Sequence, residues 1–241
     1  MKKSFFSLII GLFLSLQLKA QAYELGLMGG GGNYIGDIGR ETYFYPNQLG
    51  GGILFKKTIN PWYSFRMNLH YFQLNANDLE ANSIGRRLRR LYAEAQIYNF
   101  SIGFEYNFIP RNAFLPHQSI HKLTPYLFAG LGIGTYNSTL YRINTNNSLT
   151  GGYKYDGTNL NIPILTGLKY RLSRHFIISM EAGAYYFFTD NLDATGLYFR
   201  NMDLPGSTIT PTTNLNSNDW YTFSSIGLIY TFGDLGCYFN M

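Results

Sequence analysis

The chain has 241 residues, with 19 Lys and Arg against 14 Asp and Glu, a formal net charge of +5 and a single cysteine. Aromatic residues make up 17% of it and charged residues only 14%, whereas a soluble domain carries about 25% charged residues. One cysteine excludes an internal disulfide framework, and the excess of aromatic over charged side chains argues against an ordinary soluble domain.

The N-terminal segment has the layout of a secretory signal peptide. Two lysines precede an apolar run from Phe5 to Leu16, and small residues follow at Ala20-Gln21-Ala22. The run is too short to span a bilayer as a helix, which takes about 20 residues. We therefore predict a signal peptide over residues 1–22. Removing its three lysines leaves 16 basic residues (19 − 3) against 14 acidic ones, a charge of +2, so composition does not favour a nucleic-acid partner.

The stretch "GGGGNYIGDIG", residues 29–39, invites comparison with a phosphate-binding loop. Nucleotide loops need glycines at fixed offsets and a helix that follows them. Here Tyr34 or Ile35 stands where a third glycine is required, no Gly-Lys-Ser/Thr follows, and no helical pattern comes next. We interpret Gly29 to Gly32 as structural residues that end a β-strand and make room for bulky neighbours, with Gly36 and Gly39 in the loop turn.

Two later segments alternate apolar and polar residues with a period of two, which indicates β-strands. They are Tyr63 to Tyr71 and Tyr98 to Phe108. Weaker versions of the pattern cover residues 23–31, 49–57, 125–136, 160–170, 176–188 and 220–232. No run of 18 apolar residues follows the signal peptide, so spanning helices are excluded. The eight segments predict an all-β fold, an eight-stranded antiparallel up-and-down transmembrane β-barrel over residues 23–232 in the bacterial outer membrane.

The connections between these strands alternate in length, as in outer-membrane barrels. Residues 58–61 and 172–175 predict tight periplasmic turns, whereas residues 32–48, 75–91, 137–159 and 190–219 predict long extracellular loops. The connection 109–123 is unusually long for the short-turn side. The last strand, "SIGLIYTF", resembles the C-terminal assembly signal of such barrels through Gly227, Tyr230 and Phe232. Residues 233–241 follow it as a predicted periplasmic tail.

The alternation assigns six charged residues to the barrel interior, all in the periplasmic half of their strands. They are Glu24, Lys56, Arg66, Glu105, Lys169 and Glu181. Because buried charges persist when paired and hydrogen-bonded, a neutral ion-pair network is the first interpretation, and a proton or ion path is the second. An eight-stranded barrel is filled by its side chains, which argues against a porin. His70 also points inward and is expected to be a hydrogen-bonded interior residue.

The loop 75–91 contains "GRRLRR", with Arg86, Arg87, Arg89 and Arg90 near the outer surface. Arginine suits phosphate geometry, so these residues are candidates for contact with lipopolysaccharide among the outer-membrane lipids. The alternative is a solvated loop that is partly balanced by Asp78 and Glu80.

Enzymatic signals are weak. His117-Gln118-Ser119 is similar to the His-x-Ser arrangement of lipid A deacylase barrels, but no acidic residue follows until Asp156 and the segment should face the periplasm. No His, Cys or carboxylate spacing suggests a metal site. We therefore predict no catalytic residues, no metal and no cofactor. A lipid A-modifying enzyme and a small surface-exposed adhesion barrel remain as alternative functions.

Three segments carry a family resemblance: "YELGLMGGGGNYIGDIG" at 23–39, "TPYLFAGLGIG" at 124–134 and "FFTDNLD" at 187–193. They resemble the PorG family, the small outer-membrane barrels of the type IX secretion system, over nearly the whole mature chain. The resemblance implies a non-enzymatic barrel that associates with a periplasmic ring, formed by a lipoprotein and its partner, and holds it at the outer membrane.

If those partners are periplasmic, contact must use the short-turn face. Two features exceed what a plain barrel needs there, the 109–123 connection and the C-terminal tail. The candidate partner-binding residues are Phe114, Leu115, His117, His121, Leu235, Cys237, Tyr238 and Phe239, because exposed apolar clusters often mark interaction sites. Alternatively, both segments fold under the barrel as a lid. Cys237 is either an intermolecular thiol or a buried residue without a role.

Overall fold

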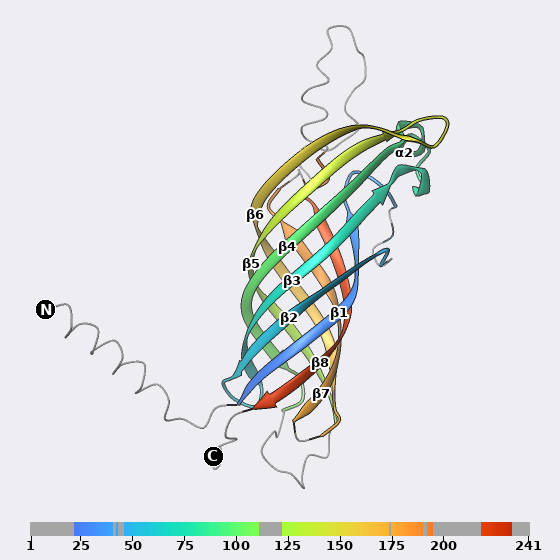
Figure 1. Ribbon diagram of the computed structural model, residues 1–241. Coiled ribbons are helices and arrows are strands. Elements are labelled where there is room, and N and C mark those ends of the chain that lie inside the picture. Colours follow the sequence, from blue (N-terminus) through green and yellow to red (C-terminus); the bar gives the residue numbers. More distant parts are fainter. Residues whose placement is uncertain are drawn as a thin grey trace, which may run out of the picture.

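The structure, a computed structural model, describes residues 22–40, 42, 46–110, 122–173, 175–189, 192–194 and 218–232. Eight antiparallel strands close into one barrel in chain order, with the last strand pairing back onto the first (Figure 1). The strands are β1 Tyr23–Ile35, β2 Gln48–Thr58, β3 Tyr63–Asn77, β4 Leu91–Asn107, β5 Leu123–Ile143, β6 Leu149–Arg171, β7 Phe176–Phe187 and β8 Trp220–Phe232. The predicted eight-stranded barrel is confirmed.

Two short helical segments, η1 Asp78–Glu80 and α2 Ile84–Arg89, connect β3 to β4 at the outer end. Neither of these, nor any other helix in the described ranges, has the length and apolar character needed to cross a membrane.

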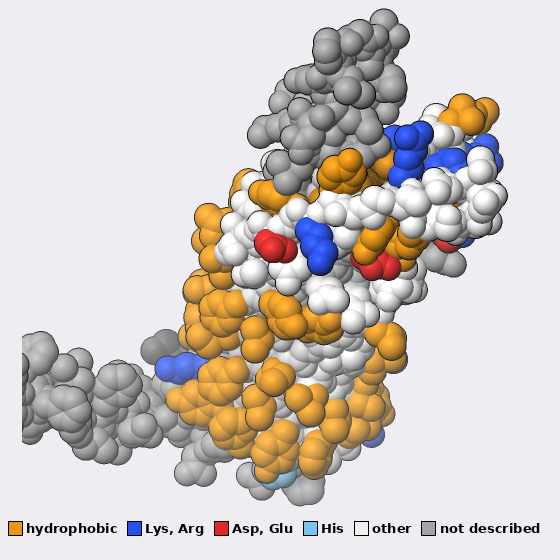
Figure 2. Space-filling view, turned by 45° about the horizontal axis from the view of Figure 1, so that its top comes forward, with side chains coloured by type: hydrophobic (Ala, Val, Ile, Leu, Met, Phe, Trp, Pro, Cys, Tyr) orange, Lys and Arg blue, Asp and Glu red, His pale blue; other side chains and the backbone are white. Residues whose placement is uncertain are grey.

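Alternation along the strands turns large apolar side chains outward. Leu69, Phe104 and Ile226 are 54%, 58% and 60% exposed, and Figure 2 shows hydrophobic side chains covering the lower part of the barrel while polar and charged ones gather above. Aromatic rings border this apolar surface, with Tyr63 against Tyr106 at one end. Such a band between aromatic girdles is the lipid-facing surface of an outer-membrane barrel.

At the outer end, Tyr71 and Tyr98 lie with ring centroids 4.9 Å apart, as do Tyr186 and Trp220. We call these four rings the upper aromatic belt. Strands β3 to β6 continue beyond it, which places polar strand segments outside the apolar band.

The prediction of a long loop over residues 137–159 is wrong. Strands β5 and β6 continue through it as a hairpin and leave only residues 144–148 as the connection, which is closed by a hydrogen bond from the Asn144 amide to the Ser148 carbonyl oxygen at 2.9 Å. Outside the bilayer an outward side chain need not be apolar, so the alternating signal fades while the backbone pairing persists. For the same reason the predicted loop 75–91 contains the end of β3 together with η1 and α2.

The glycines of 29–32 do not end β1, which runs on to Ile35. Their role in close packing is visible at Gly30, where a Cβ would lie 2.0 Å from the carbonyl oxygen of Ser224 in β8. At Gly29 a Cβ would meet nothing within 4 Å. Gly39 has a φ of +84°, so the loop turn after β1 does need a glycine.

Candidate functional site

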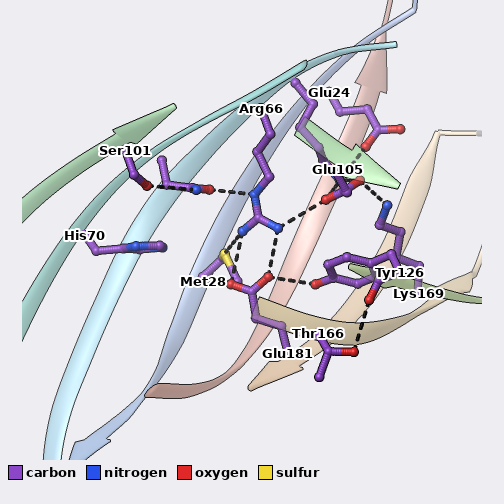
Figure 3. Close-up of polar contacts among 12 residues, drawn as sticks. Glu24, Met28, Arg66, His70, Ser101, Glu105, Tyr126, Thr166, Lys169 and Glu181 are labelled. Carbon is purple, nitrogen blue, oxygen red and sulfur yellow. Dashed lines mark hydrogen bonds and ion pairs between the residues drawn. The ribbon is translucent and has the colours of Figure 1, made fainter. Parts of the chain in front are cut away.

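The six inward charges come together in the periplasmic half of the lumen, from six different strands (Figure 3). Each side chain is at most 4% exposed. Closure of the barrel brings them together, because Arg66 in β3 and Glu181 in β7 are 115 residues apart in the chain and are joined directly.

Arg66 is one centre of this luminal ion network. Its Nη1 donates to Glu181 Oε2 at 2.8 Å and to Glu105 Oε2 at 3.1 Å, and its Nη2 donates to Glu181 Oε1 at 3.0 Å. Its Nε donates to Asn68 Oδ1 at 2.6 Å. The guanidinium also lies 4.9 Å from the ring centroid of Phe128. This fork geometry is the one that arginine offers and lysine does not.

Glu105 is the second centre. Besides Arg66 it accepts hydrogen bonds from Lys169 and, at 3.1 Å, from Lys56, and Lys56 in turn pairs with Glu24 at 3.0 Å. The six charges are three acids and three bases, so the set is neutral as a whole. Buried ions tolerate loss of solvation only when such pairing and hydrogen bonding are complete.

The sequence pattern did not single out the neutral partners of the network. Tyr126 donates its hydroxyl proton to Glu181 at 2.7 Å, and Asn107 accepts from Lys169 at 2.8 Å. Their signal was their inward parity near the periplasmic ends of β4 and β5, which would have found them as the network's hydrogen-bonding shell.

Above the network, aromatic side chains fill the outer half of the lumen. The rings of Phe72 and Phe223 lie 4.5 Å apart, and those of Tyr185 and Tyr221 lie 4.6 Å apart. His70 lies at the boundary between the two layers, with Nδ1 2.9 Å from the Tyr185 hydroxyl, so it is a hydrogen-bonded interior residue. The lumen is thus packed with side chains through both layers.

Three of the four loop arginines bind other parts of the protein. Arg86 donates to the carbonyl oxygens of Gly36 and Gly39 at 3.1 and 3.0 Å. Arg89 pairs with buried Asp78 at 2.8 Å, and Arg90 donates to the carbonyl oxygen of Ile143 at 3.0 Å. These contacts tie the segment after β1 and the β5–β6 hairpin to α2. The fourth arginine, Arg87, is exposed. The lipopolysaccharide contact stays a prediction, and Arg87 is its most exposed member.

The segment after β1 is also held from the other side. The Tyr34 hydroxyl lies 2.9 Å from Asp193 Oδ2 and 2.7 Å from Asp219 Oδ1. Nearby, burial and the charge of Asp193 raise the pKa of Asp37 to about 6, against the lowering effect of Arg89 and Arg86. The described residues at the outer end of the barrel therefore form a polar cluster, in which the pKa of the Asp37 carboxyl group is raised.

A second polar feature at the outer end escaped the sequence pattern. Beyond the upper aromatic belt, the outward positions of β3 are Gln73, Asn75 and Asn77, and those of β4 include Gln96 and Glu94. The signal for them was the continued two-residue period with the outward residues changed from aromatic to amide, which marks strands that leave the bilayer.

The predicted periplasmic binding residues, Phe114, Leu115, His117, His121, Leu235, Cys237, Tyr238 and Phe239, lie outside the described residues, as do residues 1–21 of the predicted signal peptide. Of the predicted assembly signal, Tyr230 and Phe232 face outward, 45% and 38% exposed, while Gly227 is buried. Within the described ranges, no group of three His, Cys, Asp or Glu side chains is placed to hold a metal ion.

Solved structures with a similar fold include three outer-membrane proteins. A major outer membrane protein from Thermus thermophilus has a TM-score of 0.50 at 12% identity, over 89% of this chain and 100% of that one. Ail, the attachment invasion locus protein of Yersinia pestis, in complex with the heparin analogue sucrose octasulfate, gives 0.46 at 10% identity, over 89% and 100%. Neisserial surface protein A gives 0.44 at 12% identity, over 89% and 98%.

At such low identities the likeness concerns the fold alone. The apolar band between its aromatic girdles places this barrel in the bacterial outer membrane. No curated protein sequence matches the chain. A family model described as "Domain of unknown function (DUF6089)" matches residues 3–241.

Proposed function

From the premise that the chain belongs to the DUF6089 family, we propose that it is a non-enzymatic outer-membrane barrel that associates with the periplasmic ring complex of the type IX secretion system. In this role the barrel anchors the ring, formed by a lipoprotein and its partner, to the outer membrane.

The observation that carries this proposal is the packed lumen. The charges of Arg66 and Glu105 are paired with neighbours inside the wall, and aromatic rings fill the space above them. A lumen that the described side chains fill in this way leaves no conducting path. The function that we propose is therefore exerted by a surface at one end of the barrel.

The family resemblance in the segments 23–39, 124–134 and 187–193 favours a binding surface at the periplasmic end of the barrel. A ring in the periplasm meets the barrel at its short-turn side, where the 109–123 connection and the tail 233–241 supply more chain than turns require. Their apolar residues, Phe114 and Leu115 among them, suit a protein partner.

The test is affinity purification of the intact barrel from native membranes, followed by identification of what accompanies it. The ring proteins should accompany the unaltered barrel and be lost from a Phe114→Ser/Leu115→Ser variant and from a chain without residues 233–241. Ile59→Ser is the matched control, because Ile59 is an exposed apolar residue in a tight periplasmic turn and should leave the complex intact.

Each variant is first checked for the heat-dependent gel shift of a folded barrel. If folded variants retain the ring proteins at the unaltered level, the chosen surface is wrong. If the unaltered barrel purifies without ring proteins, the proposed function itself fails.

A further inference from the structure

The outer end of the barrel contains a notch in its wall. Strand β2 begins at Gln48, paired with Gly32, whereas β1 continues to Ile35 and β3 continues from Phe72, opposite Gly50, to Asn77. Figure 1 shows β2 ending short of β3 at this end. The outer ends of β1 and β3 therefore border a gap that β2 does not fill.

Asn47 bridges the two sides of the notch. Its amide N–H donates to the carbonyl oxygen of Gly32 at 3.1 Å, and its side-chain Nδ2 donates to the carbonyl oxygen of Asn75 at 3.1 Å. Its Oδ1 is buried and receives no hydrogen bond from the described part of the chain. The bridge thus fixes the Asn47 side chain at a defined place in the notch.

A cavity of about 220 Å³ occupies this notch and is lined by four asparagines, Asn33, Asn47, Asn75 and Asn77, together with Arg40, Glu80 and Tyr92. A second cavity of about 150 Å³ adjoins it through Asn75 and is lined by further amides at Gln48, Gln73 and Gln96. Each amide offers an acceptor beside two donors. Some of these groups are used within the protein: Asn33 Nδ2 donates to the Thr42 carbonyl oxygen, Asn77 Oδ1 accepts from the Leu79 amide, and Gln73 Nε2 donates to the Tyr71 hydroxyl. The other amide groups that line the notch supply both donors and acceptors.

The charges around the notch sum to −1, one arginine against two carboxylates. Arg40 pairs with Glu80 at 3.0 Å, and the remaining carboxylate, Glu94, accepts a hydrogen bond from the Tyr92 hydroxyl at 2.9 Å. With no net positive charge among these lining residues, a phosphate or sulfate group gains little here. A neutral ligand with many hydroxyl groups fits better, because each hydroxyl both donates and accepts, and the ring of Tyr92 offers an apolar face beside a polar tip.

The position of the notch relative to the membrane also suits a ligand with many hydroxyl groups. Tyr71 and Tyr98 belong to the upper aromatic belt. Gln73 is the next outward residue of β3 beyond Tyr71, and Gln96 is the next outward residue of β4 beyond Tyr98. Interfacial aromatic rings mark the edge of the hydrocarbon, so the notch opens just above it, at the level of the sugars that glycolipids of the outer leaflet carry.

We propose that the notch between β1 and β3 is a binding site for a neutral sugar residue, which is held by the amides around Asn75. The sugar belongs either to the glycolipid of the same membrane or to a glycan from outside. This inference goes beyond the proposed association with a periplasmic ring and uses the opposite end of the barrel.

The experiment is saturation-transfer NMR on the full-length barrel in detergent. Three probes are compared: dephosphorylated core oligosaccharide from the native outer-membrane lipopolysaccharide, maltoheptaose as an unrelated neutral glycan, and inorganic phosphate as a competitor. One of the two saccharides should bind and phosphate should not displace it. Binding of the core oligosaccharide alone assigns the site to the membrane's own glycolipid, and binding of maltoheptaose points to an external glycan.

The diagnostic variant is Asn75→Leu. Only the side chain of Asn75 changes, so its carbonyl oxygen can still accept from Asn47, and affinity should fall about tenfold, the loss expected for about 1.4 kcal/mol of hydrogen bonding. The control is Asn137→Leu, an exposed outward amide on β5 that lines neither cavity; it should bind as the unaltered barrel does.

Failure of both saccharides to bind would overturn the proposal, as would displacement by phosphate or equal losses in the two variants. Co-purification of the ring proteins with Asn75→Leu should be unchanged, which separates this site from the periplasmic proposal.

Discussion

Removal of Arg66 from the luminal ion network should destabilise the barrel strongly. Its guanidinium donates to both oxygens of Glu181, to Glu105 and to Asn68. The change Arg66→Met preserves much of the side-chain length but leaves three buried acids against two bases. Leaving a buried charge without its partner costs about 3–5 kcal/mol, so the free energy of unfolding should fall by about that amount.

A compensating variant tests whether charge, rather than packing, causes the loss. Arg66→Met combined with Glu181→Gln restores neutrality, with two acids against two bases. The amide oxygen that this change places at position 181 could still accept from the Tyr126 hydroxyl, which now donates to Glu181. The double variant should recover about 2 kcal/mol relative to Arg66→Met, within the coupling range of directly paired residues.

The assay is urea unfolding of the barrel in phospholipid vesicles, followed by fluorescence of Trp62 and Trp220, the two tryptophans of the chain. Both are exposed on the outer surface, 40% and 44%. Arg142→Met is the control, because Arg142 is an exposed arginine on β5, and it should change the free energy of unfolding by less than about 0.5 kcal/mol. A loss below about 1 kcal/mol for Arg66→Met, or a double variant no more stable than the single one, would refute this account of the network.

Three further predictions concern the wall and its outer end. Gly30→Ala should prevent closure of β1 onto β8, since its Cβ would lie 2.0 Å from a backbone oxygen, whereas Gly29→Ala meets nothing within 4 Å and should give a normal heat-dependent gel shift; equal yields of folded barrel would contradict this. Arg89→Met should speed cleavage of the outer loops by added protease on intact cells, because it removes the pair with buried Asp78, while exposed Arg87→Met should not; the opposite order would count against this role of Arg89. Asp37 has a folded-state pKa of about 6 against an ordinary value of 3.8, so the folded form binds its proton more tightly and stability is lost as pH rises through about 6. Asp37→Asn should therefore raise the urea midpoint at about pH 8 and leave it nearly unchanged at about pH 4. An equal effect of the variant at the two pH values would show that burial does not raise this pKa.

The strand count and the side-chain faces followed from local rules. Between the aromatic girdles every outward residue meets lipid and every inward one meets the lumen, so the period of two at Tyr63 to Tyr71 and at Tyr98 to Phe108 fixed both the strands and their orientation. The same parity placed Arg66 and Glu105 inside.

Tertiary structure alone decided the pairings and the shape of the outer end. Which carboxylate faces Arg66 depends on the stagger of strands around a closed barrel, and Glu181 reaches it across the lumen from β7. Beyond the bilayer the outward positions face water and become polar, so the apolar-outward pattern that predicted the strands stops before the long β5–β6 hairpin and the amide-lined notch above β2. A single sequence specifies a strand by what its side chains face, whereas the ends of strands and the contacts between distant ones are set by closure of the whole wall.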